Sequence, residues 1–439
     1  MDPIAPEEFI SAVKGLPQGP ISSGSITGIS TDSRAIKPAD GFFALTGEKF
    51  DGHDYVEQVV AAGASVVVAS RRDIAARARE KNWPVVHVDD TVKALGRLAA
   101  WYRKMLPAKL VAVTGSNGKT TTKKMLETVL ASIGSVISAP KSFNNNIGVP
   151  LTLLSASRIH NYIVLEMGTN HPGEIAELGA LARPDLAVIT SLGPAHIEHF
   201  GSLENIAREK TSLLEYVPAT GFAAVCIDEP TILPYLRTFQ GRLLTFGTSR
   251  QAELRAESVQ ADDQSLRFKV NGRWQVSMNL SGRHNATNAL AAWAIGSRLG
   301  MSPEQIVEAL SRVTPPDMRL EKLRFGPITV INDAYNANPA SLAAGLRTLA
   351  EMPVPAGGRR VAVLADMLEL GSFARDLHEQ AGRQLASLGQ IDFLVAVGTH
   401  MQHLADAALA AAPKLAVQRF DNSELAAKAV ARQDRKSVV

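Results

Sequence analysis

Short apolar runs rich in β-branched residues alternate with longer Ala- and Leu-rich stretches of helical periodicity along most of the chain. This alternation is typical of parallel sheets covered by helices, so the predicted fold class is α/β. Helices are expected near residues 55–62, 203–216 and 286–298. The expected strands are residues 28–30, 41–45, 65–68, 85–88, 162–165, 186–189, 222–227, 328–331, 360–364 and 393–397.

Breaks in this pattern suggest how the chain is divided into domains. With 439 residues, the chain is long enough for about two to four domains. The first α/β segment ends near Lys104, and the pair Pro315-Pro316 interrupts the chain after a long helix. Asn271-Gly272 is typical of a tight β-hairpin turn within the middle segment. We therefore expect a small domain over residues 1–104, a central parallel-sheet domain with a hairpin region over 105–314, and a third α/β domain over 315–439.

Composition narrows the function classes. The net charge of +3 arises from 46 basic and 43 acidic residues, and no dense basic run is interleaved with aromatic residues, so nucleic acid is not an expected partner. No stretch approaches about 18 consecutive apolar residues, and Met1-Asp2-Pro3-Ile4 lacks a basic-then-apolar pattern, so neither a membrane span nor secretion is expected. The single cysteine, Cys226, lies in an apolar run and is expected to pack as a small hydrophobic residue in a reducing, cytoplasmic protein.

A glycine-bounded loop follows the apolar strand that begins at Val111. It reads Gly115-x-x-Gly118-Lys119-Thr120, which is shorter than the general phosphate-loop pattern because Val113 stands where the first glycine would fall. Backbone N–H groups of such a loop and the following helix N-terminus form an anion site, and a lysine ammonium and a threonine hydroxyl suit phosphate and Mg²⁺. An ordinary turn with a surface lysine is the alternative, but a helical pattern starts directly after the glycines. The loop therefore predicts nucleotide binding.

Polar residues at strand ends are the next candidates. Glu166 ends an apolar strand and could hold Mg²⁺, although a solvated acid would give the same pattern. His196 follows another strand, and a lone histidine is usually no ligand. The carboxyl ends of parallel strands share one sheet edge, so we expect Glu166, His196 and the phosphate loop to meet in one crevice. By pattern alone, Lys210 on the following helix is a solvated lysine.

Three further polar groups have no evident role in a core. Asn285 and Asn288 are three residues apart on one helix face, where amides either read a base or cap the helix. Arg319 lies just past the proline pair, where a moving domain could deliver its guanidinium to a phosphate. Residues 332–339 form a polar loop after a strand, and such loops usually bind a ligand.

In this order, these segments resemble the Mur ligase family of peptidoglycan synthesis, whose members join an amino acid or a dipeptide to a UDP-muramoyl substrate. The resemblance covers nearly the whole chain. It is closest to the branch that adds a dipeptide, because residues 332–339, and residues 366–371 followed by His378, look like that branch's signatures. It implies an ATP-dependent ligase with a UDP-substrate domain, a P-loop ATPase-like domain and a Rossmann-like domain for the amine. The implied substrates are UDP-N-acetylmuramoyl-tripeptide and D-alanyl-D-alanine, joined through an acyl phosphate, and the implied state is a monomer.

The resemblance also implies roles for individual residues. Lys119, Lys210, His196 and Arg319 would be catalytic. Two Mg²⁺ ions would be held by Thr120, Glu166, His196 and Lys210, the last as a carbamoylated lysine. ATP would be bound by Gly115, Ser116, Asn117, Gly118, Lys119, Thr120, Thr121, Asn285, Asn288, Arg319 and Asp333. The other substrates would be bound by Ser33, Arg34, Lys141, Asn144, Asn145, Asn146, Tyr335, Asn336 and Asn338.

One departure from the family and two alternatives remain. Family members usually continue to a Val-Lys-Gly-Ser-like string, whereas this sequence ends Lys436-Ser437-Val438-Val439, so a truncated third domain is expected. The first alternative is a related ligase that adds another amino acid or elongates a folate glutamyl tail. The chain lacks the Asp-Asn-Pro-Arg string that resembles the diaminopimelate-adding member, which favours the dipeptide. The second alternative is a regulatory module that hydrolyses a nucleotide without forming an amide.

Overall fold

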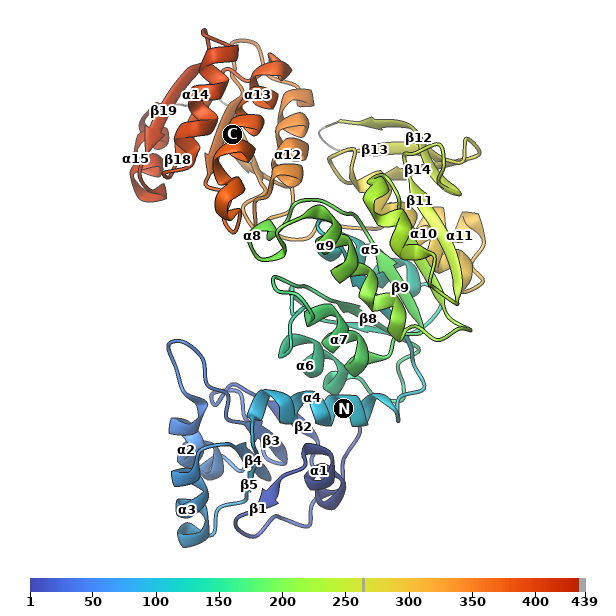
Figure 1. Cartoon of the computed structure of the whole chain (residues 1–439), viewed down its shortest axis with the longest axis vertical. Coiled ribbons are helices and arrows are strands. Elements are labelled where there is room, and N and C mark those ends of the chain that lie inside the picture. Colours follow the sequence, from blue (N-terminus) through green and yellow to red (C-terminus); the bar gives the residue numbers. More distant parts are fainter. Residues whose placement is uncertain (263–264, 434–439) are drawn as a thin grey trace. The chain divides into compact units, whose positions relative to one another are not determined.

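The computed structural model of the protein describes residues 1–262 and 265–433 (Figure 1). The described chain forms two compact units, and the middle of the sequence contributes to both. The first unit comprises residues 1–112, 134–169 and 174–186, and the second comprises residues 113–133, 170–173 and the chain from Ala187 onward. The string Lys436–Val439, on which the expected truncation depends, lies outside the described residues.

The N-terminal part of the first unit is a sheet with the strand order β1-β5-β4-β3-β2. Strands β2 to β5 are parallel neighbours, and β1 pairs antiparallel with β5. Its core contains Phe42, Val67, Trp83 and Val85. The strands are β1 (Leu16–Pro17), β2 (Gly28–Ser30), β3 (Asp40–Phe43), β4 (Val66–Ala69) and β5 (Val85–His87). The helices are α1 (Pro6–Val13), η1 (Gly52–Tyr55), α2 (Val56–Ala61), α3 (Arg72–Lys81) and α4 (Thr91–Arg103).

The rest of the first unit packs against α4. The fully buried Tyr102 of α4 donates its hydroxyl to the Ala156 carbonyl at 2.8 Å, and Arg103 pairs with Asp185 at 2.9 Å. The elements here are β7 (Val136–Ser138), α6 (Gly148–Ser155), β8 (Tyr162–Glu166) and α7 (Glu174–Ala182). Strands β6 (Lys109–Thr114) and β9 (Leu186–Ile189) begin in this unit and end in the second.

The central sheet has the strand order β14-β13-β12-β11-β10-β9-β6-β8-β7 among the described residues. Strands β10 to β12 are parallel, and β12 to β14 are antiparallel. The predicted hairpin is confirmed, with Asn271 (φ 48°) and Gly272 (φ 67°) in its turn. Its connection has three residues, 271–273, and not the two that the Asn-Gly pair suggests, because Val270 pairs with Trp274. The strands are β10 (Phe222–Cys226), β11 (Arg242–Gly247), β12 (Leu254–Ala261), β13 (Leu266–Val270) and β14 (Trp274–Met278). The helices are α5 (Lys119–Leu130), α8 (Ile197–Phe200), α9 (Leu203–Thr211), η2 (Ser212–Tyr216), η3 (Pro230–Leu236), α10 (Asn285–Arg298) and α11 (Pro303–Ser311).

The C-terminal elements of the second unit form an antiparallel pair, β15 and β16, and a parallel sheet of β17, β18 and β19. Their apolar core includes Leu346, Leu385 and Leu404, and it also takes in Ile197 and Phe200 of α8. The strands are β15 (Glu321–Phe325), β16 (Ile328–Asn332), β17 (Val361–Ala365), β18 (Phe393–Val397) and β19 (Ala416–Phe420). The helices are α12 (Pro339–Glu351), η4 (Gly371–Phe373), α13 (Ala374–Leu388), α14 (Met401–Ala411) and α15 (Ser423–Gln433).

The predicted α/β class is confirmed, and each predicted strand is present with ends within two residues of those expected. The helix expected over 203–216 was predicted too long, because the α-helix ends at Thr211 and the chain continues as a 3₁₀-helix to Tyr216. Cys226 is 4 % exposed, as expected of a small apolar residue. Among the described helices, none combines the length and apolar character needed to cross a membrane.

Candidate active site

The phosphate loop lies between β6 and α5, as the sequence predicts. Gly118 (φ 81°) immediately precedes α5, and Gly115 also has a positive φ of 148°. A Cβ atom at Gly118 would lie 2.2 Å from Asn288 Oδ1, and one at Gly115 would lie 2.0 Å from Thr190 Oγ1. Both positions therefore require glycine, for conformation and for space. The chain is thus free to present backbone N–H groups at the start of α5.

The loop is held in place by the segment that follows β9. The backbone N–H of Asn117 donates to Ser191 Oγ at 2.9 Å. Ser116 Oγ donates to the Gly193 carbonyl at 2.8 Å and accepts from the Gly193 N–H at 3.0 Å. Lys119 Nζ donates to the Gly115 carbonyl at 2.8 Å, so the ammonium lies back across its own loop. These hydrogen bonds fix the conformation of the phosphate loop. An ordinary turn with a surface lysine, the alternative considered above, would not need them.

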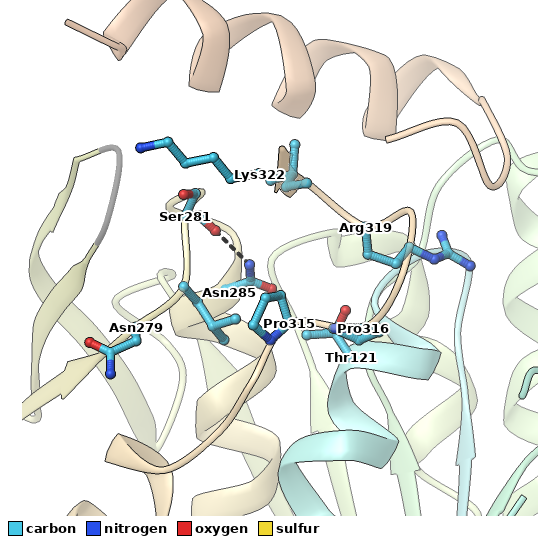
Figure 2. A pocket seen from close by; sticks show the side chains of 10 residues that line it. Thr121, Asn279, Ser281, Asn285, Pro315, Pro316, Arg319 and Lys322 are labelled. Atoms are coloured by element: carbon cyan, nitrogen blue, oxygen red, sulfur yellow. Dashed lines mark hydrogen bonds between the residues drawn. The ribbon is translucent and has the colours of Figure 1, made fainter. Parts of the chain in front are cut away.

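A cavity of about 340 Å³ lies beside the start of α5 (Figure 2). On one wall, Asn285 Nδ2 donates to the Ser281 carbonyl at 2.8 Å. On another, the Arg319 guanidinium stacks 4.1 Å from the Tyr335 ring centre, and its buried Nε has no hydrogen-bond partner among the described residues. A buried, unpaired donor favours a ligand with acceptor atoms. The lining residues are Thr121, Asn279, Leu280, Ser281, Asn285, Pro315, Pro316, Arg319, Leu320 and Lys322.

Two other predicted nucleotide residues, Asn288 and Asp333, each contact a residue that lines this cavity. Asn288 Nδ2 donates to Asn285 Oδ1 at 2.9 Å, so the two amides expected on one helix face form a buried pair. Asp333 accepts from the Leu320 N–H at 3.2 Å, and burial raises the pKa of its carboxyl. Sequence reasoning did not single out Asn279, Ser281 or Lys322, because single polar residues on different segments give no local pattern.

Lys210 is buried, which corrects the interpretation of it as a solvated lysine. It is 3 % exposed on α9. Burial first, and then the nearby Lys119 ammonium, lower the pKa of Lys210 to about 7, against the opposing effect of Glu209. A large part of this amine is therefore neutral near neutral pH, and a neutral amine is nucleophilic. No periodicity in the sequence signals this burial.

His196 lies in the same electrostatic environment. Burial lowers the pKa of its imidazole, the Glu369 carboxylate raises it, and Lys119 and Lys210 lower it further. The ring is therefore mainly neutral, and its Nδ1 bonds to the Glu369 carboxylate. The structure thus brings together Lys119, His196 and Lys210, three of the predicted catalytic residues.

Glu166 ends β8 in the first unit and is 2 % exposed, so the interpretation of it as a solvated acid is wrong. Its Oε1 accepts from Asn144 Nδ2 at 2.9 Å. The neighbouring Asn145 accepts the backbone N–H groups of Ile147 and Gly148 with its Oδ1 and so caps the start of α6. Two of the predicted substrate residues therefore also stabilise this loop.

The donor set bears on whether Mg²⁺ would fit. In the part of the chain that the structure describes, no group of three or more His, Cys, Asp or Glu side chains is arranged to hold a metal ion. Mg²⁺ is usually held by one or two protein oxygens together with substrate phosphates and water, rather than by an all-protein cage. A threonine hydroxyl at Thr120, beside a phosphate cradle, fits that kind of site.

The other predicted substrate residues lie on loops. In the first unit, Arg34 is exposed and makes two hydrogen bonds to Asp32, at 2.9 and 2.8 Å. In the second unit, Asn336 accepts from the Ala337 N–H at 2.9 Å, and Asn338 pairs with Asn117 of the phosphate loop. Ser33 is half-buried, while Lys141 and Asn146 are exposed. Asn338 is therefore tied to the nucleotide loop.

Sequence models of known families match three parts of the chain. The Mur ligase family catalytic domain matches residues 25–103, the Mur ligase middle domain 113–296, and the Mur ligase glutamate ligase domain 318–439. The chain belongs to the Mur ligase family. This Mur ligase has the phosphate loop and the buried lysine in the middle-domain match, and Arg319 and Asp333 in the C-terminal match.

Two relatives and one fold neighbour place this Mur ligase within the family. UDP-N-acetylmuramoyl-tripeptide--D-alanyl-D-alanine ligase of Escherichia coli (strain K12) is 35 % identical over 398 residues, covering 89 % of this chain and 85 % of that protein. A crystal structure of MurF from Acinetobacter baumannii is 31 % identical, with a TM-score of 0.88 over 100 % of this chain and 95 % of that one. A Thermotoga maritima MurF structure in complex with ADP has the same fold, with a TM-score of 0.80 at 24 % identity over 94 % and 93 % of the two chains.

Proposed function

We propose that this Mur ligase uses ATP to join D-alanyl-D-alanine to UDP-N-acetylmuramoyl-tripeptide, which yields the UDP-muramoyl-pentapeptide, ADP and phosphate. The observation that carries the proposal is the phosphate loop with Lys119, Lys210 and His196 around it, in a chain whose relatives bear that name. Residues 1–104 would bind the UDP-substrate, residues 105–314 ATP, and residues 315–439 the dipeptide. We further propose that the enzyme works as a monomer in the cytoplasm.

The chemistry requires an activated carboxylate. A carboxylate is a poor electrophile, so the substrate carboxylate attacks the γ-phosphorus of ATP, the bond to the bridging oxygen breaks, ADP leaves, and an acyl phosphate results. The Lys119 ammonium, pre-positioned across the loop, would neutralise charge on the transferring phosphoryl group. The neutral dipeptide amine then attacks the acyl carbon, phosphate leaves, and the nitrogen loses one proton as the amide forms.

The nucleotide would lie along the phosphate loop and in the adjoining cavity. Gly115 to Thr121 would cradle the phosphates, and Asn285, Asn288 and Asp333 would contact the nucleoside. The unpaired Nε of Arg319 is suited to a phosphate or ribose oxygen. The cavity of about 340 Å³ falls within the usual size range of small-molecule sites.

Two Mg²⁺ ions would be held by Thr120, Glu166, His196 and Lys210 together with the phosphates. When bound, they supply charge neutralisation for the phosphoryl group and orient it for in-line attack. Lys210 can bind Mg²⁺ only if its positively charged ammonium is converted into a negatively charged group. Its burial, with a pKa of about 7, supports a neutral amine that adds to CO₂ and gives a carbamate oxygen ligand.

The dipeptide and the tripeptide would be recognised by residues on loops rather than by the sheet. Ser33 and Arg34 would contact the UDP moiety, and Lys141 and Asn144 to Asn146 the muramoyl peptide. Tyr335, Asn336 and Asn338 would face the dipeptide. The exposed Tyr335 ring, held under Arg319, supports a binding surface next to the nucleotide site.

An acceptor panel tests this proposal. The purified protein is given ATP, Mg²⁺ and UDP-N-acetylmuramoyl-tripeptide with D-alanyl-D-alanine, meso-diaminopimelate, lysine or glutamate, and phosphate release is measured. Release that depends on D-alanyl-D-alanine supports the proposal. Release with another amine would indicate a related ligase. Release that needs no UDP-muramoyl acceptor would indicate a nucleotide-hydrolysing module.

A further inference from the structure

The loop that follows β17 contacts the turn that carries His196. His196 Nδ1 bonds to the Glu369 carboxylate, and the backbone N–H of Glu198 donates to the Glu369 carbonyl at 3.2 Å. His196 (φ 56°) and Glu369 (φ 58°) both have the left-handed backbone conformation that residues with a Cβ rarely adopt. Two such residues at one contact indicate that the surrounding structure holds both backbone segments in these conformations.

The surroundings explain how the contact is held. Ile197 follows His196, and Met367 and Leu370 flank Glu369; all three belong to one buried apolar cluster. The same loop is also anchored to α13. The buried His378 of that helix accepts the Met367 N–H at Nε2 (3.1 Å) and donates from Nδ1 to the Ala374 carbonyl (2.7 Å). Glu369 therefore lies in a loop that is fixed by the buried Met367, two residues before it, and the buried Leu370, directly after it, whereas Leu368 between them is exposed.

The chemistry of the pair fixes which ring nitrogen carries the proton. An ionised carboxylate only accepts hydrogen bonds, so Nδ1 of His196 must be the donor. In the neutral ring, Nε2 then has the lone pair, and the described residues form no hydrogen bond to it. Metal-binding histidines usually donate their other N–H to a carboxylate or carbonyl in this way.

We propose that Glu369 is a positioning residue for His196, and that its carboxylate holds the imidazole in the tautomer and orientation in which Nε2 binds a divalent cation. The inference rests on the proposed function, because it takes His196 as a Mg²⁺ ligand. It assigns a role to the loop over residues 366–371, which the sequence marks only as a signature. It also makes cation binding at His196 dependent on the position of that loop.

The first test reads the tautomer without any metal. Full-length protein labelled with ¹⁵N-histidine is compared with Glu369→Ala and Glu369→Gln, and the His196 signals are identified by their loss in His196→Gln. We expect Nδ1–H in the wild type and in Glu369→Gln, whose amide oxygen still accepts, and Nε2–H or a mixture in Glu369→Ala. An unchanged tautomer in Glu369→Ala overturns the proposal.

The second test measures affinity for Mn²⁺, the probe cation, by EPR of free Mn²⁺ in the presence of a non-hydrolysable ATP analogue. We expect Glu369→Ala to weaken binding by on the order of 10-fold to 100-fold. The double variant with His196→Gln should bind no more weakly than His196→Gln alone, since Glu369 acts through His196. Additive losses, or wild-type affinity in Glu369→Ala, contradict the proposal.

A matched control is Glu379→Gln on α13, which removes a partly exposed carboxylate that pairs with Arg375 at 3.0 Å. It should leave both the tautomer and the Mn²⁺ affinity unchanged. Failure of the two proposals can be told apart. If the Mn²⁺ coupling is present but no amide forms, the proposed function fails and the positioning role stands; if the pentapeptide forms and the coupling is absent, the reverse holds.

Discussion

Asn117 of the phosphate loop and Asn338 at the start of α12 exchange two side-chain hydrogen bonds. Asn117 Nδ2 donates to Asn338 Oδ1 at 3.2 Å, and Asn338 Nδ2 donates to Asn117 Oδ1 at 2.7 Å. Asn338 Oδ1 also accepts the Ser341 N–H at 3.0 Å and so caps the helix. One amide thus joins the proposed phosphate cradle to the helix that follows the polar loop over 332–338.

Asn338→Ala should weaken both ATP binding and stability, because it removes the amide pair and the helix cap together. A double-mutant cycle with Asn117→Ala, measured by urea unfolding, should give a coupling energy of about 1 kcal/mol. Ser341→Ala is the control, since it removes the reciprocal half of the capping box without touching Asn117. A coupling energy of zero would show that the hydrogen bonds between the two amides do not contribute to the free energy of unfolding.

Gly118→Ala should abolish ATP binding. The added Cβ would lie 2.2 Å from Asn288 Oδ1, and the residue has a φ of 81°. Gly300→Ala is a matched control, because Gly300 has a φ of 91° but nothing within 4 Å of a new Cβ. The control should lose about 1 kcal/mol of stability and keep its ATP affinity, measured by calorimetry. Equal ATP affinities of Gly118→Ala and Gly300→Ala would contradict the proposal that the loop around Gly118 binds the phosphates.

Arg319→Ala should raise the KM for ATP by about 10-fold or more, since a charged hydrogen bond to the nucleotide is lost. The KM for the UDP-substrate should change little. Arg324→Ala, an exposed arginine on neighbouring β15, is the control and should leave both constants unchanged. If the two arginine variants behave alike, Arg319 has no part in nucleotide binding.

Lys210→Ala should lose activity and recover part of it when formate or acetate is added. The short acid would replace the carbamate oxygen in the space that the buried side chain leaves. The same acids should not stimulate the wild type or Lys124→Ala, which removes a partly exposed lysine on α5. Full activity of Lys210→Ala without any added acid would remove the lysine from the metal site.

The carboxyl group of Asp51 makes the stability of the first unit depend on pH in the acid range. Burial raises the pKa of its carboxyl, but hydrogen bonds from the His53 N–H and ring, and from Arg71, outweigh this and lower the pKa to about 2. The folded pKa lies below the unfolded value, so this stabilisation is present above about pH 4 and is lost as the pH falls through about 2.

Asp51→Asn should therefore unfold with a free energy about 2 kcal/mol lower than the wild type at pH 7, and the difference should shrink as the pH falls from 4 toward 2. Urea unfolding across that range checks it. Asp54→Asn is the control, because Asp54 contacts the same Arg71 from an exposed position and should cost little at any pH. A pH-independent difference for Asp51→Asn would point to lost packing instead.

Local pattern was enough to predict the elements and the phosphate loop. Strands such as β8 and β10 are continuous apolar runs, and the glycines at 115 and 118 mark a backbone that only glycine can adopt. The burial of Lys210 was not predictable in the same way, because an amphipathic helix exposes most of its lysines. The Asn117 and Asn338 pair, 221 residues apart, follows from tertiary packing that has no local signal.

The site shows the same limit. A role for Arg319 could be proposed from its place after the proline pair. Its stacking on Tyr335 and the burial of its Nε, however, depend on how separate segments of the chain pack together. Glu369 lies in a recognisable signature, yet nothing in the sequence indicates that its partner is His196. The domain limits at Lys104 and Pro315 and the individual residue roles stay predictions until the variants are measured.

The most direct test of the acyl-phosphate ligation is an isotope transfer. UDP-N-acetylmuramoyl-tripeptide carrying ¹⁸O in its reacting carboxylate is incubated with the protein, ATP, Mg²⁺ and D-alanyl-D-alanine, and the products are analysed by mass spectrometry. The account predicts the UDP-muramoyl-pentapeptide together with inorganic phosphate that carries one ¹⁸O atom. Phosphate without ¹⁸O, or phosphate formed without the pentapeptide, would contradict it.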